Sequence, residues 1–210
     1  MVDPGYDLLV TTSGTTFDGA PFVGLPLGTY NFGGSIGLQN VGNTDTIVQR
    51  LGTANAPSGT VAIQMDALQL VSATPISFGG GPLGFYYVTL QSVDMTGPAS
   101  TGGMTINFAP NTFTSSLDVF FDVHYGALDG PIVDKSDAIL SNGGDTWGNV
   151  APAGAITIPG VNLNLNGNDT TDDFWPAVPV PEPTTVMAGA LLLLPIGMST
   201  LRILRKKRTA

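Results

Sequence analysis

The chain has 210 residues, of which 42% are hydrophobic and 11% are charged, with no cysteine and a single histidine, His124. Disulfides, zinc–thiolate sites, iron–sulfur clusters and cysteine nucleophiles are therefore excluded. Residues 1–180 hold two basic residues, Arg50 and Lys135, against fifteen aspartates, which gives this part a net charge of −13. Such an acidic body repels nucleic acid, so nucleic acid is excluded as a partner.

Hydrophobic residues recur at every second position along residues 1–175, a period that predicts β-strands. The predicted strands cover residues 46–51, 60–65, 68–72, 85–92, 104–108, 117–125, 155–158 and 160–165. Glycine-rich turn signals stand at residues 79–82, 102–103 and 142–144. Many short strands with no helix between them predict an all-β domain, an antiparallel β-sandwich of the jelly-roll kind.

The clearest predicted strand, residues 117–125, has two different faces. One face carries Leu117, Val119, Phe121, Val123 and Tyr125. The other carries Asp118, Phe120, Asp122 and His124. A register slip of one residue would bury the carboxylates and expose the apolar side chains, so we expect the apolar face in the core and the polar face in solvent.

Asp122 and His124 share the polar face, with side chains about 7 Å apart at two-residue spacing. Such a pair could hold a metal ion, or act as base and orienter for a serine nucleophile. We favour the simpler interpretation, a solvated face. The body lacks a Gly-x-Ser-x-Gly elbow, and the only glutamate, Glu182, lies outside it, so we predict no catalytic residue and no enzymatic activity.

Residues 162–173 match the spacing of an EF-hand calcium loop, with Gly167 at the sharp turn. The oxygen ligands of such a loop would come from Asn162, Asn164, Asn166, Thr170 and Asp173. Asparagine stands where the first aspartate is usual and Asp173 where a bidentate glutamate is usual, which predicts weak calcium affinity. The interpretation that we favour is a strand ending in an Asn-Gly turn, with calcium as the one candidate cofactor.

The C-terminal part of the chain has three successive segments. Residues 176–183 contain four prolines and predict an extended linker. Residues 184–201 carry no charge and, as a helix, would span about 27 Å, enough for a membrane core of roughly 30 Å. The tail 202–210 follows, with the stop-transfer residues Arg202, Arg205, Lys206, Lys207 and Arg208. Their positive charge predicts a cytoplasmic tail and a body on the opposite side of the membrane.

This order of segments, with Pro181, Glu182 and Pro183 before the apolar helix, resembles the PEP-CTERM sorting signal of Gram-negative bacteria. The resemblance implies processing by exosortase, a membrane transpeptidase that cuts near the motif, so that the helix is a temporary anchor in the inner membrane. A permanent C-terminal anchor is the alternative. Residues 3–8, residues 45–51 and the run from 112 to 147 also resemble a recurrent group of PEP-CTERM proteins with no assigned activity.

The residues that follow Met1 do not form a secretory leader, so we expect the native gene to begin upstream. A tail-anchored cytoplasmic protein is the alternative, but it would place the basic tail outside. The leading hypothesis is a non-enzymatic protein of the cell surface, extracellular matrix or biofilm. The alternatives are a secreted hydrolase acting on polysaccharide and a carbohydrate-binding module that uses Trp147 or Trp175 as a stacking platform.

Overall fold

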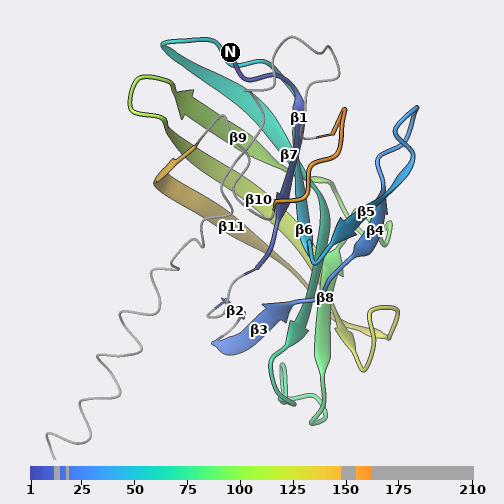
Figure 1. The fold of residues 1–210 in the computed structure, drawn as a ribbon. Coiled ribbons are helices and arrows are strands. Elements are labelled where there is room, and N and C mark those ends of the chain that lie inside the picture. Colours follow the sequence, from blue (N-terminus) through green and yellow to red (C-terminus); the bar gives the residue numbers. More distant parts are fainter. Residues whose placement is uncertain (12–14, 18, 148–154, 162–210) are drawn as a thin grey trace, which may run out of the picture. The chain divides into compact units, whose positions relative to one another are not determined.

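The computed structural model describes residues 1–11, 15–17, 19–147 and 155–161. The chain forms two compact units, Met1–Pro179 and Val180–Ala210, and all described residues belong to the first. Its strand pairs are antiparallel (Figure 1), so the predicted all-β antiparallel fold is confirmed. The strands are β1 Gly5–Leu9, β2 Thr16–Phe17, β3 Ala20–Gly24, β4 Gly28–Asn31, β5 Leu38–Gly42, β6 Thr46–Arg50, β7 Ser58–Ser72, β8 Tyr86–Leu90, β9 Ser100–Asn107, β10 Thr112–Tyr125 and β11 Ile132–Thr146.

Two long strands, β7 and β10, organise the larger sheet. Nine strands form it, in the order β1–β6–β7–β8–β10–β11, with β3 on β7, β2 on β3, and β9 between β7 and β10. β8 and β9 therefore lie end to end in the same row, at opposite ends of the long strands (Figure 1). Leu90 at the end of β8 pairs with Phe121, and Thr101 near the start of β9 pairs with Asp118. The connection 91–99 must consequently leave the sheet plane beside the middle of β10.

At Asp66, the alternation of core-facing and outward-facing side chains along β7 is reversed. Ala67 pairs with Ile47, whereas Met65 pairs with Val48, so Asp66 is an extra residue in β7. Such a bulge reverses the side-chain alternation of the strand beyond it. The buried positions are accordingly odd-numbered up to residue 67 and even-numbered from residue 68.

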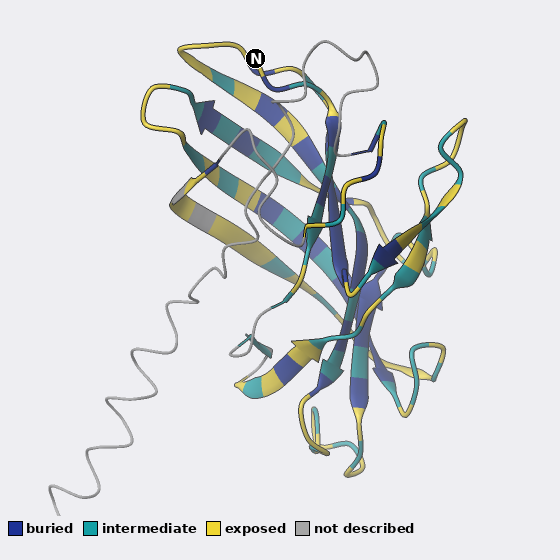
Figure 2. Cartoon of the chain, viewed as in Figure 1, coloured by how far each residue is buried: buried dark blue, intermediate teal, exposed yellow. Residues whose placement is uncertain are grey.

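The main core lies on one face of the large sheet, and buried residues occur along its central strands (Figure 2). The main apolar cluster draws on β6, β7, β8, β9 and β10, and Trp147 packs against its end. A second cluster forms around Val41, Ile158 and Val161, where the β4–β5 hairpin and residues 155–161 cover Tyr6 and Leu8 of β1. Successive side chains of β1 point to opposite faces of the sheet, so Leu8 packs into the second cluster and its neighbour Leu9 into the main cluster.

The four strands predicted at 46–51, 85–92, 104–108 and 117–125 are confirmed as β6, β8, β9 and β10, and the two predicted at 60–65 and 68–72 are joined as β7. The strand predicted at 155–158 is wrong, because those residues are irregular, and residues 102–103 and 142–144 lie inside strands and not in turns. The strand predicted at 160–165 lies mostly outside the described residues. Within the described ranges no helix is long and apolar enough to cross a membrane.

Candidate functional site

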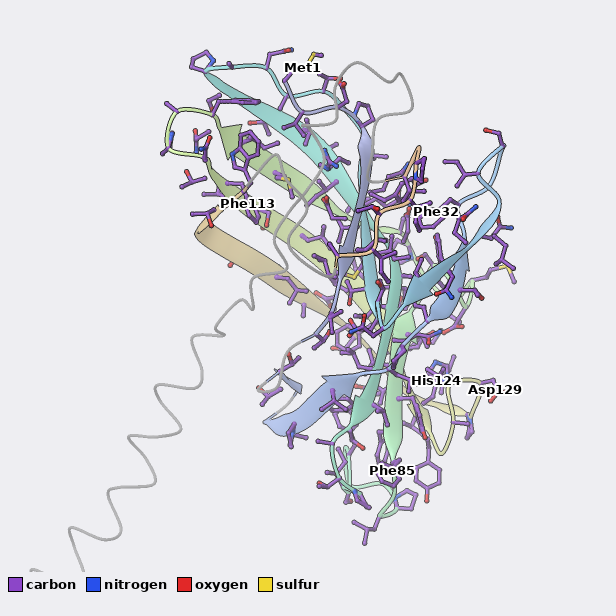
Figure 3. The ribbon with its side chains drawn as sticks, in the orientation of Figure 1. Met1, Phe32, Phe85, Phe113, His124 and Asp129 are labelled. Atoms are coloured by element: carbon purple, nitrogen blue, oxygen red, sulfur yellow. The ribbon has the colours of Figure 1, made fainter. Side chains whose placement is uncertain are left out.

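A group of polar side chains is buried on the face of β10 opposite the core. Two connections cover this face: 91–99, between β8 and β9, and 126–131, between β10 and β11. Figure 3 shows His124 beside the loop that carries Asp129. The pairing of Asp122 with Thr89 across β10 and β8 brings the hydroxyl of Thr89 to the same place.

Connection 91–99 is tied to the sheet by Gln91. Its Nε2 donates to the backbone oxygens of Phe121, at 3.0 Å, and Ser136, at 3.3 Å. The backbone N–H of Thr96 donates to the backbone oxygen of Gln91 at 2.8 Å, which closes a turn in which Met95 has a φ of 56°. This left-handed residue directs the following Thr96 back toward β10, where its hydroxyl donates to Asp122 Oδ2.

His124 is 3% exposed and hydrogen-bonded through both ring nitrogens. Its Nδ1 lies 3.0 Å from the backbone oxygen of Gly130. A carbonyl oxygen only accepts, so we assign the proton to Nδ1. Nε2 lies 2.7 Å from Thr89 Oγ1 and 3.2 Å from Asp94 Oδ2.

Two carboxylates complete the group. Asp122 is fully buried, and its Oδ1 contacts no hydrogen-bond partner in the described part of the chain. Asp94 is partly exposed and accepts a hydrogen bond from Thr89 at 2.5 Å. One oxygen of each carboxylate and one nitrogen of His124 lie within 4.8 Å of one another. We refer to Asp94, Asp122 and His124 as the polar cluster.

The prediction that Asp122 and His124 lie on a solvated face is wrong. The alternation along β10 is as predicted, since Leu117, Val119, Phe121 and Val123 are all buried in the main core. The opposite face is nevertheless buried at its C-terminal half, because connection 91–99 and loop 126–131 cover it. Asp118, nearer the middle of the strand, is only partly buried.

Sequence reasoning found Asp122 and His124 but missed Asp94, Thr89 and Thr96. Asp94 and His124 are 30 residues apart in the chain, so no local spacing joins them. The signal that could have found them is the short connection between Leu90 and Ser100. Because β8 and β9 lie end to end beside β10, the residues that join them must pass over β10.

The hydroxyl at His124 Nε2 comes from Thr89 and not from a serine, and the group that orients the ring is a backbone carbonyl. The polar cluster therefore does not have the base-and-orienter arrangement around a serine that was the alternative to a solvated face. It presents acceptor atoms to one another, and an arrangement of this kind can bind a cation or a proton.

Trp147, which the carbohydrate-binding alternative would use as a stacking platform, is buried and does not present its ring to solvent. It is 7% exposed, its ring packs edge-on against Phe108 with centroids 5.3 Å apart, and its Nε1 donates to the oxygen of Asn107 at 3.2 Å. Trp175, the calcium-loop residues Asn162, Asn164, Asn166, Thr170 and Asp173, the sorting signal, the apolar segment and the basic tail lie outside the described residues.

A partly exposed aromatic group occurs instead at the β4–β5 hairpin. The ring of Phe32 packs edge-on against Tyr30, at 4.9 Å, and Tyr6, at 5.0 Å. The pKa of Tyr30 is raised to about 12, mainly by burial and then by the charge of Asp66 and by the neighbouring Tyr6. Burial also raises the pKa of Asp66, against an opposing hydrogen bond from Gln64. The hairpin thus carries an aromatic surface with a carboxyl group close by.

Comparison of the chain with protein-family models, with curated proteins and with solved structures finds no match. The evidence for function therefore comes from the chain itself.

Proposed function

We propose that this chain is an exported protein, sorted by exosortase, whose β-domain has a structural or adhesive role at the cell surface or in the extracellular matrix. The observation that carries the proposal is the order of the last segments: Pro181-Glu182-Pro183, the uncharged residues 184–201, and the basic residues 202–208. Each segment alone is common, but their succession in this order is what a membrane-processed sorting signal requires.

The finer architecture belongs to the same proposal. Residues 184–201 form a single membrane-spanning helix before processing, with the acidic body outside the inner membrane. The β-domain has the fold of a jelly-roll-like sandwich. Support for it comes from the two-stranded sheet β4–β5, which together with residues 155–161 packs on the face of the nine-stranded sheet that carries Tyr6 and Leu8.

The burial of the polar cluster supports a non-enzymatic role. Asp122 and His124 are among the buried residues, as is Thr89. A polysaccharide chain would have to displace both covering segments to reach them. The alternative functions, a polysaccharide hydrolase or a carbohydrate-binding module, draw support from the two converging carboxylates and from the aromatic surface of Tyr6, Tyr30 and Phe32.

Intact-mass measurement of the surface fraction tests the sorting proposal. In a host with exosortase, the mature chain should lack the residues beyond about Pro183. Replacing Pro181, Glu182 and Pro183 with alanine should leave the uncut precursor in the inner membrane, whereas alanine at Pro176 should leave processing unchanged. A surface product that retains Leu201–Ala210 would show a permanent anchor instead.

The β-domain is tested separately, because its role does not depend on how the chain is anchored. Cells that lack the protein should lose matrix cohesion and recover it with His124→Asn. Polysaccharide hydrolysis that this substitution abolishes would favour the hydrolase. Polysaccharide binding that Tyr30→Ala abolishes would favour the carbohydrate-binding module.

A further inference from the structure

We propose that Asp94, Asp122 and His124 bind a divalent transition-metal cation of the zinc class, which fastens connection 91–99 and loop 126–131 to β10. The proposal goes beyond the sorting function and does not depend on it. It rests on the arrangement of protons in the polar cluster, on the charge balance there, and on the distances between the ligand atoms.

The protons available to the polar cluster are too few for its acceptors. With its proton on Nδ1 facing Gly130, a neutral His124 presents the Nε2 lone pair to Thr89 and Asp94. The single hydroxyl proton of Thr89 can go to Nε2 or to Asp94 Oδ2, but not to both. Two acceptor atoms then face each other across 3.2 Å, an arrangement that a positive charge between them would stabilise.

The charge balance points the same way. A buried ion pair elsewhere in this sheet joins one cation and one anion: Arg50 Nε lies 3.3 Å from Asp7 Oδ2. The polar cluster joins two carboxylates to one imidazole. Lys135 pairs with Asp122 in the register of β10 and β11, but its ammonium donates to the backbone oxygen of Thr96 at 3.4 Å. Asp122 Oδ1 is buried without a hydrogen-bond partner in the described part of the chain, and burying such a group costs free energy.

The ligand set selects the kind of cation. An imidazole nitrogen suits zinc and its neighbours, whereas calcium and magnesium take oxygen ligands. With bonds of about 2.0–2.1 Å, a tetrahedral ion holds its ligand atoms roughly 3.3 Å apart. The 3.2 Å between His124 Nε2 and Asp94 Oδ2 fits this value, and the third ligand atom lies within 4.8 Å.

The surroundings of His124 fit a metal ligand as well. Metal-binding histidines generally donate the other ring N–H to a carbonyl or carboxylate, which fixes the ring. Here that acceptor is Gly130, where a Cβ would overlap the backbone oxygen of Tyr125, so the loop geometry depends on glycine. The partly exposed Asp94 leaves a path for the ion to enter and for water to supply a fourth ligand.

Zinc titration of the full chain, purified in detergent without a histidine tag, tests this. His124 is the only histidine and there is no cysteine, so an imidazole- or thiolate-ligated site elsewhere in the chain is excluded. After chelator treatment and addition of Zn²⁺, we expect one ion per chain by elemental analysis and a higher melting temperature. Asp122→Asn and His124→Gln should weaken zinc binding at least tenfold. The control Asp129→Asn changes an exposed carboxylate of loop 126–131 and should bind as the wild type does.

Zinc binding that survives both Asp122→Asn and His124→Gln would overturn the assignment. A wild-type chain whose melting temperature and metal content do not respond to Zn²⁺ would overturn it as well. Displacement of Zn²⁺ by equimolar Ca²⁺ would also contradict it. If Asp122→Asn does not fold, Asp94→Asn, at the more exposed ligand, decides the matter by the same tenfold criterion.

Discussion

The two faces of β10 are both buried near its C-terminal end, but by different means. Phe121 and Val123 belong to the main apolar cluster, whereas Asp122 and His124, on the alternate positions, are covered by two connections and held by hydrogen bonds. Contact with many neighbours stabilises the first face, and the second depends on a few specific partners. Substitutions on the two faces should therefore lower the free energy of unfolding by different amounts.

The largest effect should come from the apolar face. Phe121→Ala removes a ring that is 5% exposed, and we expect a loss of about 3–5 kcal/mol from the free energy of unfolding, by lost burial and by the cavity that remains. Denaturant unfolding of the full chain measures it. Ile139→Ala on β11, where the side chain is 73% exposed, is the control and should stay within about 0.5 kcal/mol. Equal effects would mean that the core does not lie on this face.

His124→Ala should be next in size. In the presence of a chelator we expect a loss of about 1–3 kcal/mol, because the backbone oxygen of Gly130 and the hydroxyl of Thr89 lose a buried partner. His124→Asn should recover part of it, since the Asn amide can donate toward Gly130. A loss under about 0.5 kcal/mol for alanine would restore the solvated-face interpretation that the sequence favoured.

Phe121 and His124 also show what could be predicted from the sequence and what could not. Alternation along residues 117–125 predicted the core face correctly, because side chains of one strand must point in turn to opposite faces. What covers the other face depends on where β8 ends and β9 begins, and only the pairing of Leu90 and Thr101 with β10 determines that.

Two other elements show the same limit. β11 was not predicted, because its exposed apolar residues come in adjacent pairs, Ile132–Val133 and Ile139–Leu140, without alternation. β7 was predicted as two strands, because the bulge at Asp66 reverses the pattern within one strand. Periodicity identifies a strand only where one regular face is buried.

Gln91→Ala should have a smaller effect, confined at first to the covering segment. Gln91 donates two hydrogen bonds across the sheet, to Phe121 and Ser136, and we expect its loss to cost about 1–2 kcal/mol. Amide hydrogen exchange should accelerate in residues 91–99 before it does in β7. Gln91→Glu should be worse than alanine, because a carboxylate oxygen would replace the donor facing the two carbonyls. Protection that remains unchanged in residues 91–99 would show that other contacts hold the connection.

The smallest effect is expected at Met95, where two opposing contributions nearly cancel. Its φ of 56° costs an L-residue roughly 1–2 kcal/mol, which glycine avoids. Glycine also makes the unfolded chain more flexible, which costs about 0.4–1 kcal/mol. The side chain is 91% exposed, so no packing is lost, and Met95→Gly should stabilise the chain by about 0.5 kcal/mol. Met95→Val should destabilise it, because a β-branched residue fits the left-handed region poorly. Thermal unfolding of both variants measures the difference. A stabilising valine would mean that residue 95 is not held in this turn, and that the hydroxyl of Thr96 reaches Asp122 without it.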